Sequence, residues 1–241
     1  MALETDHNGM FIGGMTHPDE LGNYLGSRFP ENNIQHTYDS LVEASKALAR
    51  IEGTTPLRAF WRLMDRAFEE KTWQLKCKRG CGHCCHTGVS VTQMEWDGIM
   101  DRVKQNGIDL DVLIERSQKT IRRIRDTLGK KKDLDHVDWH RLVVNQPCPF
   151  LDDEQACIVY EDRPLDCRLV VAFRDVCQSK KLEHAQRGVY IEEAVASTVI
   201  ARLQHDQTPK FKRRKFHGTQ PLKLLQHWLI LWQEKKSKKC R

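Results

Sequence analysis

Nine cysteines are the residues of this 241-residue chain whose type and spacing best suit chemistry. Four of them fall within nine residues, and four more follow in the second half, separated from one another by eight or nine residues. Thiolates are strong ligands for zinc and for iron–sulfur clusters, and several must converge on one centre. The sequence therefore predicts a metal site, with candidate ligands Cys77, Cys81, Cys84, Cys85, Cys148, Cys157, Cys167 and Cys177.

The residues around these cysteines favour ionised sulfur. Gly80 and Gly82 let the backbone of the first group turn tightly, so that neighbouring thiols can face one centre. A helix that begins near Pro164 would place Cys167 at the positive end of its dipole. Basic side chains flank both groups and are expected to lower thiol pKa values: Lys76, Lys78, Arg79, Arg163 and Arg168. His83 and His86 are expected to support the ligands or to be exposed rather than to ligate, and Cys240 is expected to be a free thiol.

Composition limits the class of protein. Hydrophobic residues make up 39% and charged residues 30% of the chain, which is ordinary for a globular protein. No secretory signal or apolar stretch of about 20 residues is evident, so we expect no transmembrane segment and a cytoplasmic location. Because the cytosol keeps thiols reduced, the cysteines point to metal rather than to disulfides. The net charge of +6 is mild.

Helical patterns dominate the segments that must position the cysteines. Capping boxes predict helices that begin at Ser40 and Thr92, and Thr55 is expected to cap a third helix with Pro56 at its first position. A fourth helix is expected at about 109–130, packed as an antiparallel hairpin on the helix at 92–106. Further helices are expected at about 190–205 and 221–236. The expected inward side chains of the helices before the second cysteine group are Leu41, Ala44, Leu48, Ile51, Leu57, Phe60, Trp61, Met64, Phe68, Trp96, Ile99, Met100, Val103, Leu110, Leu113, Ile114, Ile121, Ile124 and Leu128.

The second cysteine group lies in a different kind of segment. Prolines on both sides of Cys148 resist helix, and the residues 156–160 resemble a short strand. A small hairpin at this point would bring Cys148 and Cys157 side by side. We therefore expect a mainly α-helical fold that carries a small cysteine-rich irregular or β-hairpin metal-binding element.

Three ranges describe the expected domain organisation. Residues 1–36 are expected to form an irregular N-terminal arm, residues 37–206 a helical domain with the metal site, and residues 207–241 a basic linker with a C-terminal helix.

Three runs of residues, in this order, resemble the YkgJ-like family, also called the CxxCxxCC zinc- or iron-chelating domain. They are Gly80-Cys-Gly-His-Cys-Cys85, Cys148-Pro-Phe-Leu151 and Cys157-Ile-Val-Tyr-Glu-Asp-Arg-Pro-Leu-Asp-Cys-Arg168. The resemblance covers about residues 77–177 and implies metal-site positions at Cys77, Cys81, Cys84, Cys85, Cys148, Cys157 and Cys167. Three residues separate Cys77 from Cys81, where the family name has two.

The nature of the metal and the activity stay open between several readings. The wide spacing of the second group and the adjacent Cys84-Cys85 pair favour an iron–sulfur cluster over zinc. Cys77, Cys81 and Cys84 also match the spacing of radical S-adenosylmethionine enzymes, although no strand–helix repeat follows them. Flagellin lysine N-methylases resemble YkgJ-like proteins, which keeps an iron–sulfur-dependent protein-modifying enzyme as an alternative. Whether the chain is an enzyme is undecided.

A further alternative is a nucleic-acid or protein adaptor with a structural metal. The basic run 210–215, with Phe211 among its charges and Phe216 directly after it, could contact such a partner. A solvated linker is the competing interpretation of the same run.

Overall fold

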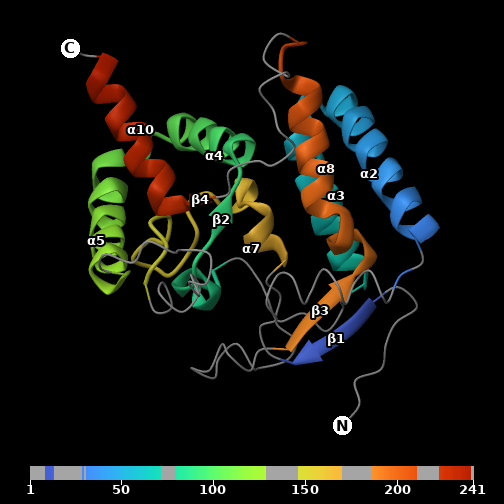
Figure 1. The fold of residues 1–241 in the computed structure, drawn as a ribbon, viewed down its shortest axis with the longest axis horizontal. Coiled ribbons are helices and arrows are strands. Elements are labelled where there is room, and N and C mark those ends of the chain that lie inside the picture. Colours follow the sequence, from blue (N-terminus) through green and yellow to red (C-terminus); the bar gives the residue numbers. More distant parts are fainter. Residues whose placement is uncertain are drawn as a thin grey trace. The chain divides into compact units, whose positions relative to one another are not determined.

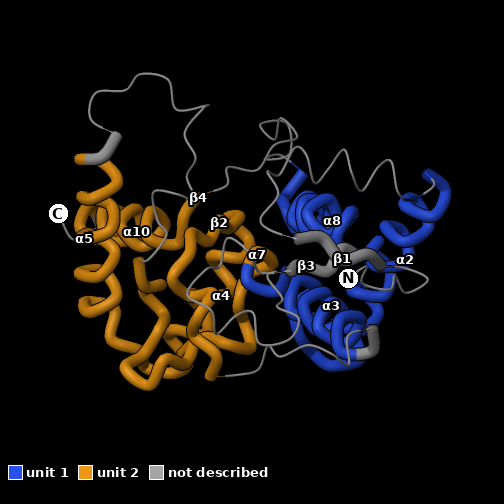
Figure 2. Tube along the Cα trace, turned by 90° about the horizontal axis from the view of Figure 1, so that it is seen from below, with its two compact units in different colours: residues 1–77, 167–220 blue, residues 78–166, 221–241 orange. Residues whose placement is uncertain are grey.

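A computed structural model describes residues 9–13, 29, 31–71, 80–128, 146–169, 186–210 and 223–239 (Figure 1). Across these ranges the fold is mainly α, as the helical patterns predict. Two compact units divide the chain: unit 1 comprises residues 1–77 and 167–220, and unit 2 comprises residues 78–166 and 221–241 (Figure 2). No helix of the described ranges is long and apolar enough to span a membrane. The three domain ranges expected from sequence stay a prediction.

Unit 1 is a packed set of three helices with a two-stranded sheet. Helices α2 (Glu31–Glu52), α3 (Pro56–Lys71) and α8 (Ile191–Gln207) pack on one another, and strands β1 (Gly9–Gly13) and β3 (Gln186–Tyr190) pair antiparallel. The core between the helices is apolar, so burial of hydrophobic surface holds this unit together. Its most completely buried large side chains are Phe60, Trp61, Met64, Tyr190, Ile200 and Leu203.

Unit 2 combines helices with short and irregular segments. Helix α5 (Leu110–Leu128) packs against α10 (Leu225–Lys239), while strands β2 (Ser90–Val91) and β4 (Lys223–Leu224) pair antiparallel. Trp228 of α10 stacks on Trp96 of α4 (Gln93–Gln105), with ring centroids 6.3 Å apart, and donates to the carbonyl of Val91. The remaining elements are the 3-10 turns η1 (His83–His86) and η2 (Tyr160–Asp162) and, crossing into unit 1, the short helix α7 (Leu165–Leu169).

Local signals placed two helices correctly. The Thr55 hydroxyl accepts a bond from the amide of Arg58 at 3.2 Å, at the start of α3. At α4, the hydroxyl of Thr92 accepts from the amide of Glu95 and the Glu95 carboxylate accepts from the amide of Thr92, which is the predicted capping box. Both inward stripes are buried. Asn106 and Gly107, with φ of +60° at the glycine, end α4 as expected.

Three expectations about helices are wrong. Helix α2 begins at Glu31, so Ser40 lies inside it rather than capping it. Its buried residues are Val42, Ser45 and Ala49, one position on from the expected stripe, and Ile51 of that stripe is 81% exposed. The acidic first residue complements the helix dipole, and Gln35 donates to Asp39 one turn on, which supports a start that has no apolar stripe. Helix α5 packs mainly on α10 and does not form a hairpin with α4. The apolar face of α5 can be buried by any apolar surface, and α10, which lies about a hundred residues later in the sequence, covers it.

Candidate metal centre

The loop that carries the first cysteine group is built by its glycines and by backbone bonds. Gly80 has a φ of +86°, a backbone conformation that is unfavourable for residues with a Cβ atom. The turn η1 follows, with the amide of Cys85 bonded to the carbonyl of Gly82 at 3.0 Å. Thr87 closes the loop, because both its amide and its hydroxyl donate to the carbonyl of Cys84. The three cysteines of this loop, Cys81, Cys84 and Cys85, are each partly exposed.

The second cysteine group forms the predicted hairpin. The amide of Asp152 donates to the carbonyl of Ala156 at 2.9 Å, and the amide of Ile158 donates to the carbonyl of Phe150 at 3.0 Å. Cys157 forms a single antiparallel bridge with Leu151. The strand expected at 156–160 is limited to this bridge, because the chain turns into η2 directly after it. The hairpin holds the Cys148 side chain almost completely buried, with 7% exposed.

The loop and the hairpin meet directly, although about sixty residues separate them in sequence. The amide of Cys148 donates to the carbonyl of Cys85 at 2.6 Å. Gly82 packs so closely on the hairpin turn that an added Cβ would lie 2.7 Å from the carbonyl oxygen of Gln155. Gly80 thus serves the turn, whereas Gly82 serves the close approach of the two segments. The fold brings parts of both cysteine groups to one place.

Electrostatics at the meeting point disfavour thiolates that have no cation beside them. Burial raises the pKa of Cys148 to about 12, with further contributions from Cys157 and Cys84, while a bond from the amide of Phe150 acts in the opposite direction. Burial also raises the pKa of Cys157, against a bond from the amide of Val159 and the charge of Arg163. Each of these two sulfurs therefore accepts an N–H bond from the residue two positions on. Backbone bonds of this kind stabilise charged sulfur in metal sites.

These groups fit a thiophilic metal in their chemistry. Cys84, Cys148 and Cys157 are close enough to disfavour one another's ionisation, so a cation among them would remove the cause of that repulsion. Their arrangement is not yet that of a bound site: within the described ranges, no three His, Cys, Asp or Glu side chains are placed to hold a metal ion. Binding thus requires the thiols to turn toward a common centre or to be joined by a ligand from outside these ranges.

Helix α4 fixes the segment that follows the hairpin. The carboxylate of Glu95, which is 2% exposed, accepts bonds from the amide of Leu165 at 2.7 Å and from Thr92. Two turns further along α4, Arg102 forms an ion pair with the buried Asp162. Burial raises the pKa of Glu95 despite its three bonds. Two charged side chains of one helix therefore hold η2 and the beginning of α7.

Further polar contacts complete the support of the site within unit 2. The Asp166 carboxylate accepts from the amide of Ser90 at 2.9 Å, and Arg116 of α5 donates to the carbonyl of Leu151 at 2.6 Å. Sequence reasoning predicted Glu95 only as a cap and missed the roles of Arg102, Asp162 and Arg116. The run of polar residues between Cys157 and Cys167 is the signal that could have indicated buried partners there.

The other predicted site residues either lie away from the contact between loop and hairpin or fall outside the described ranges. Cys167 lies in the first turn of α7, as predicted, where the second segment of unit 1 begins. Its neighbour Arg168 is buried and ion-paired with Asp65 of that unit. His83 is exposed, and His86 points its Nδ1 atom at the carbonyl of Gly82, 3.2 Å away. Three cysteines lie outside the described ranges: Cys77, Cys177 and Cys240.

The buried Cys148 and the partly exposed Cys157 of the hairpin, joined by backbone bonds to a loop with three partly exposed cysteines, form a cysteine-rich cluster in unit 2. Residues 76–188, a little under half of the chain, match the family model described as "CxxCxxCC: Putative zinc- or iron-chelating domain". The match supports metal binding in general, by zinc or iron. No curated protein and no solved structure shows a significant match to the chain.

Proposed function

We propose that the chain binds iron or zinc through a site shared by its two cysteine groups, with Cys84, Cys148 and Cys157 as the nucleus of the ligand set. The observation that carries the proposal is the bond between Cys148 and Cys85, which fixes the hairpin on the loop. It is supported by the mutual electrostatic effects of the three thiols. Adjacent side chains diverge, so we assign Cys84 and Cys85 to different roles.

The remaining ligands come from the rest of the predicted set. Cys81 is partly exposed on the same loop as Cys84 and is the nearest candidate in sequence. Cys77, Cys167 and Cys177 stay predictions that mutation must test. Of the two metals, we favour iron in an iron–sulfur cluster, because only Cys81 and Cys84 form a Cys-x2-Cys pair of the kind typical of zinc sites and the second group is widely spaced. Such a cluster would supply electron transfer, whereas zinc would supply structural cross-linking.

Elemental analysis and a visible absorption spectrum of protein purified without oxygen test this proposal. An iron–sulfur cluster predicts iron and acid-labile sulfide together with visible absorption that bleaches on reduction. Stoichiometric zinc and a colourless protein would keep the chelating function but reject the cluster. Protein that holds neither metal, and that takes up neither when it is supplied after reduction of its thiols, would contradict metal binding altogether.

A further inference from the structure

Two neighbouring helices of unit 2 carry a strong excess of basic side chains. Helix α5, strand β4 and helix α10 together contain ten lysines and arginines against four carboxylates. Part of this charge is neutralised locally, since Lys119 pairs with Glu115 at 2.9 Å and Arg116 lies 3.5 Å from Asp153. Arg122 and Arg125, toward the C-terminal end of α5, form no ion pair within the described ranges.

These cations are held on a common apolar platform. Ile121 and Ile124 of α5 pack with Leu224 of β4, and Ile230 of α10 packs against this cluster. Gln118 donates to Gln233 across the two helices at 3.2 Å. Residues next to these contacts flank the line where α5 meets β4 and α10, and we call this set the basic seam: Arg122, Arg125, Lys223 and His227.

Like charges meet at the basic seam around His227, whereas Arg122 also acts on the exposed carboxylate of Glu115, two turns earlier on α5. Burial lowers the pKa of His227, and the charges of Lys223 and Arg125 lower it further. Within the described ranges, neither Arg125 nor Lys223 makes an ion pair, and the guanidinium of Arg122 bonds only to the carbonyl of Gln118. Asp126, the nearest carboxylate in sequence, is exposed and unpaired there. Clustered cations on a rigid platform favour an anion as the missing partner.

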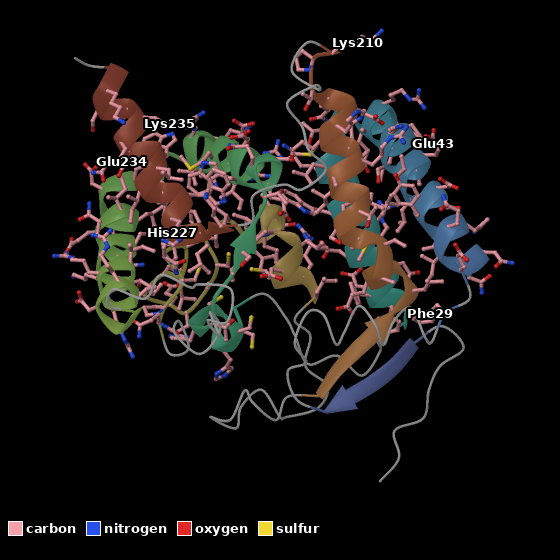
Figure 3. All side chains as sticks on the ribbon, in the orientation of Figure 1. Phe29, Glu43, Lys210, His227, Glu234 and Lys235 are labelled. Carbon is pink, nitrogen blue, oxygen red and sulfur yellow. The ribbon has the colours of Figure 1, made fainter. Side chains whose placement is uncertain are left out.

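Helix α10 extends the positive surface beyond the seam. His227 lies in its first turn and Lys235 about two turns further on (Figure 3). Lys235, Lys236 and Lys238 are exposed, and Lys236 lies over the ring of the half-buried Trp232, 5.3 Å from its centroid. A track of cations beside an accessible aromatic ring matches the way in which proteins bind single strands, with phosphates on the charges and bases on the rings.

We propose that the basic seam and the exposed face of α10 bind the phosphate backbone of a single-stranded nucleic acid. This surface is distinct from the cysteine residues and from the basic run 210–215, of which all but Lys210 lies outside the described ranges. The binding is electrostatic, so it does not depend on base sequence and weakens as salt is raised.

Fluorescence anisotropy with a labelled 20-nucleotide oligo(U) tests the proposal in the full chain, at potassium chloride concentrations from 50 to 200 mM. The seam variant is Arg122→Gln/Arg125→Gln/Lys223→Gln. The matched control, Arg50→Gln/Arg62→Gln/Arg66→Gln, removes the same charge from exposed positions of unit 1. Loss of three phosphate contacts should reduce the slope of log K against log salt by about 2 and weaken binding at least about tenfold, while the control binds like the wild type.

The outcomes separate cleanly when both variants retain wild-type circular dichroism and metal content. Equal losses in seam and control variants, unchanged binding by the seam variant, or absence of binding by the wild type at 50 mM salt would each overturn the proposal. Tighter binding of a 20-base-pair duplex than of the single strand would overturn the single-strand assignment. If the seam variant misfolds, the exposed double variant Lys235→Glu/Lys238→Glu replaces it, with the same expected loss.

Discussion

The two compact units are held together in different ways. Unit 1 buries a continuous apolar core between three helices, in which Phe60, Met64 and Val199 have no exposed surface. The cysteine-bearing part of unit 2 has little regular structure and depends on directional contacts, such as those of Glu95, Arg102 and the bond between Cys148 and Cys85. Apolar packing tolerates small shifts, whereas a thiolate site requires fixed positions. We therefore expect the folded structure of the cysteine-bearing part of unit 2 to depend on bound metal, and that of unit 1 to be independent of it.

Metal removal should produce the largest effect and should act on one unit only. Metal binding to several thiolates is linked to folding and contributes on the order of 10 kcal/mol in small zinc domains. We expect a strong chelator, or a bipyridyl for iron, to abolish amide exchange protection in residues 146–166. Helices α2, α3 and α8 should keep theirs, as measured by hydrogen–deuterium exchange with mass spectrometry. Equal loss of exchange protection in both units, or no loss in either, would contradict the expected difference in metal dependence between them.

The converse change is Phe60→Ala in the core of unit 1. Removal of a fully buried phenylalanine leaves a cavity and should lower the free energy of unfolding by about 3–5 kcal/mol. Chemical denaturation measures this loss, and metal content at low denaturant should be that of the wild type. If the variant loses its metal while it remains folded, the metal site depends on the unit 1 core, against the account.

Glu95→Gln sharpens the role of polar support in unit 2. A glutamine can accept only with its carbonyl oxygen, so one of the amides of Thr92 and Leu165 loses its acceptor, at a cost of about 1–3 kcal/mol. The matched control is Glu115→Gln, at an exposed position of α5, which should change stability little. Equal effects of the two substitutions in thermal denaturation would show that burial of the carboxylate is unimportant.

The same variant has a pH signature of defined sign. Because burial raises the folded-state pKa of Glu95 above its unfolded value, its contribution is fully present below the unfolded pKa and is lost as pH rises through the folded value. The stability of the wild type relative to Glu95→Gln should therefore fall as pH rises from about 4.5. A difference between the two proteins that is constant over this range would contradict the shift.

Two glycine substitutions separate the turn from the close approach. Gly82→Ala places a methyl group against the carbonyl of Gln155 and should cost about 1–3 kcal/mol, with weaker metal retention, because the hairpin must move away. Gly80→Ala meets no atom within 4 Å but is strained at a φ of +86°, and should cost about 1–2 kcal/mol. Competition with a colorimetric chelator measures retention. Greater metal loss from Gly80→Ala would reverse the assigned roles.

The smallest expected effect concerns an ion pair in unit 1. Burial acts to raise the pKa of Asp206, but bonds from Lys46, Arg202 and His205 outweigh it and lower that pKa to about 2. The pair with Lys46, at 2.9 Å, is partly exposed, so Asp206→Asn should cost only about 0.2–1 kcal/mol at pH 7. The cost should vanish as pH falls from about 4 toward 2. The exposed control Asp101→Asn should lower the melting temperature at pH 7 by less than Asp206→Asn does.

Local patterns were sufficient to predict much of the fold. The cap and stripe of α3, the capping box of α4 and the hairpin at Cys148 and Cys157 each depend on residues within about ten positions of one another, and all three are confirmed. The start of α2 was not predictable in this way, because its first two turns hold a single aliphatic residue, Ile34, and have no capping box. The partner of α5 was missed because an apolar stripe does not specify what covers it.

The candidate site was predictable in its ligand types but not in its support. Cysteine spacing alone indicated a metal, and proline and polar turn residues indicated the hairpin. The pairing of Arg102 with Asp162 joins residues sixty positions apart, and the bond from Leu165 to Glu95 joins residues seventy positions apart. No periodicity encodes contacts of that range. The cysteines as ligands, including Cys167, stay a prediction.

The central claim is that both cysteine groups contribute to one metal site, and the metal content of matched single variants tests it most directly. Cys84→Ala and Cys157→Ala each remove one thiol, from the loop and from the hairpin, and Cys240→Ala is the control. Elemental analysis of anaerobically purified protein should show the same severe loss of metal in the first two variants and full content in the third. Full metal content in Cys157→Ala, beside loss in Cys84→Ala, would show that the first group binds alone and would contradict the shared site.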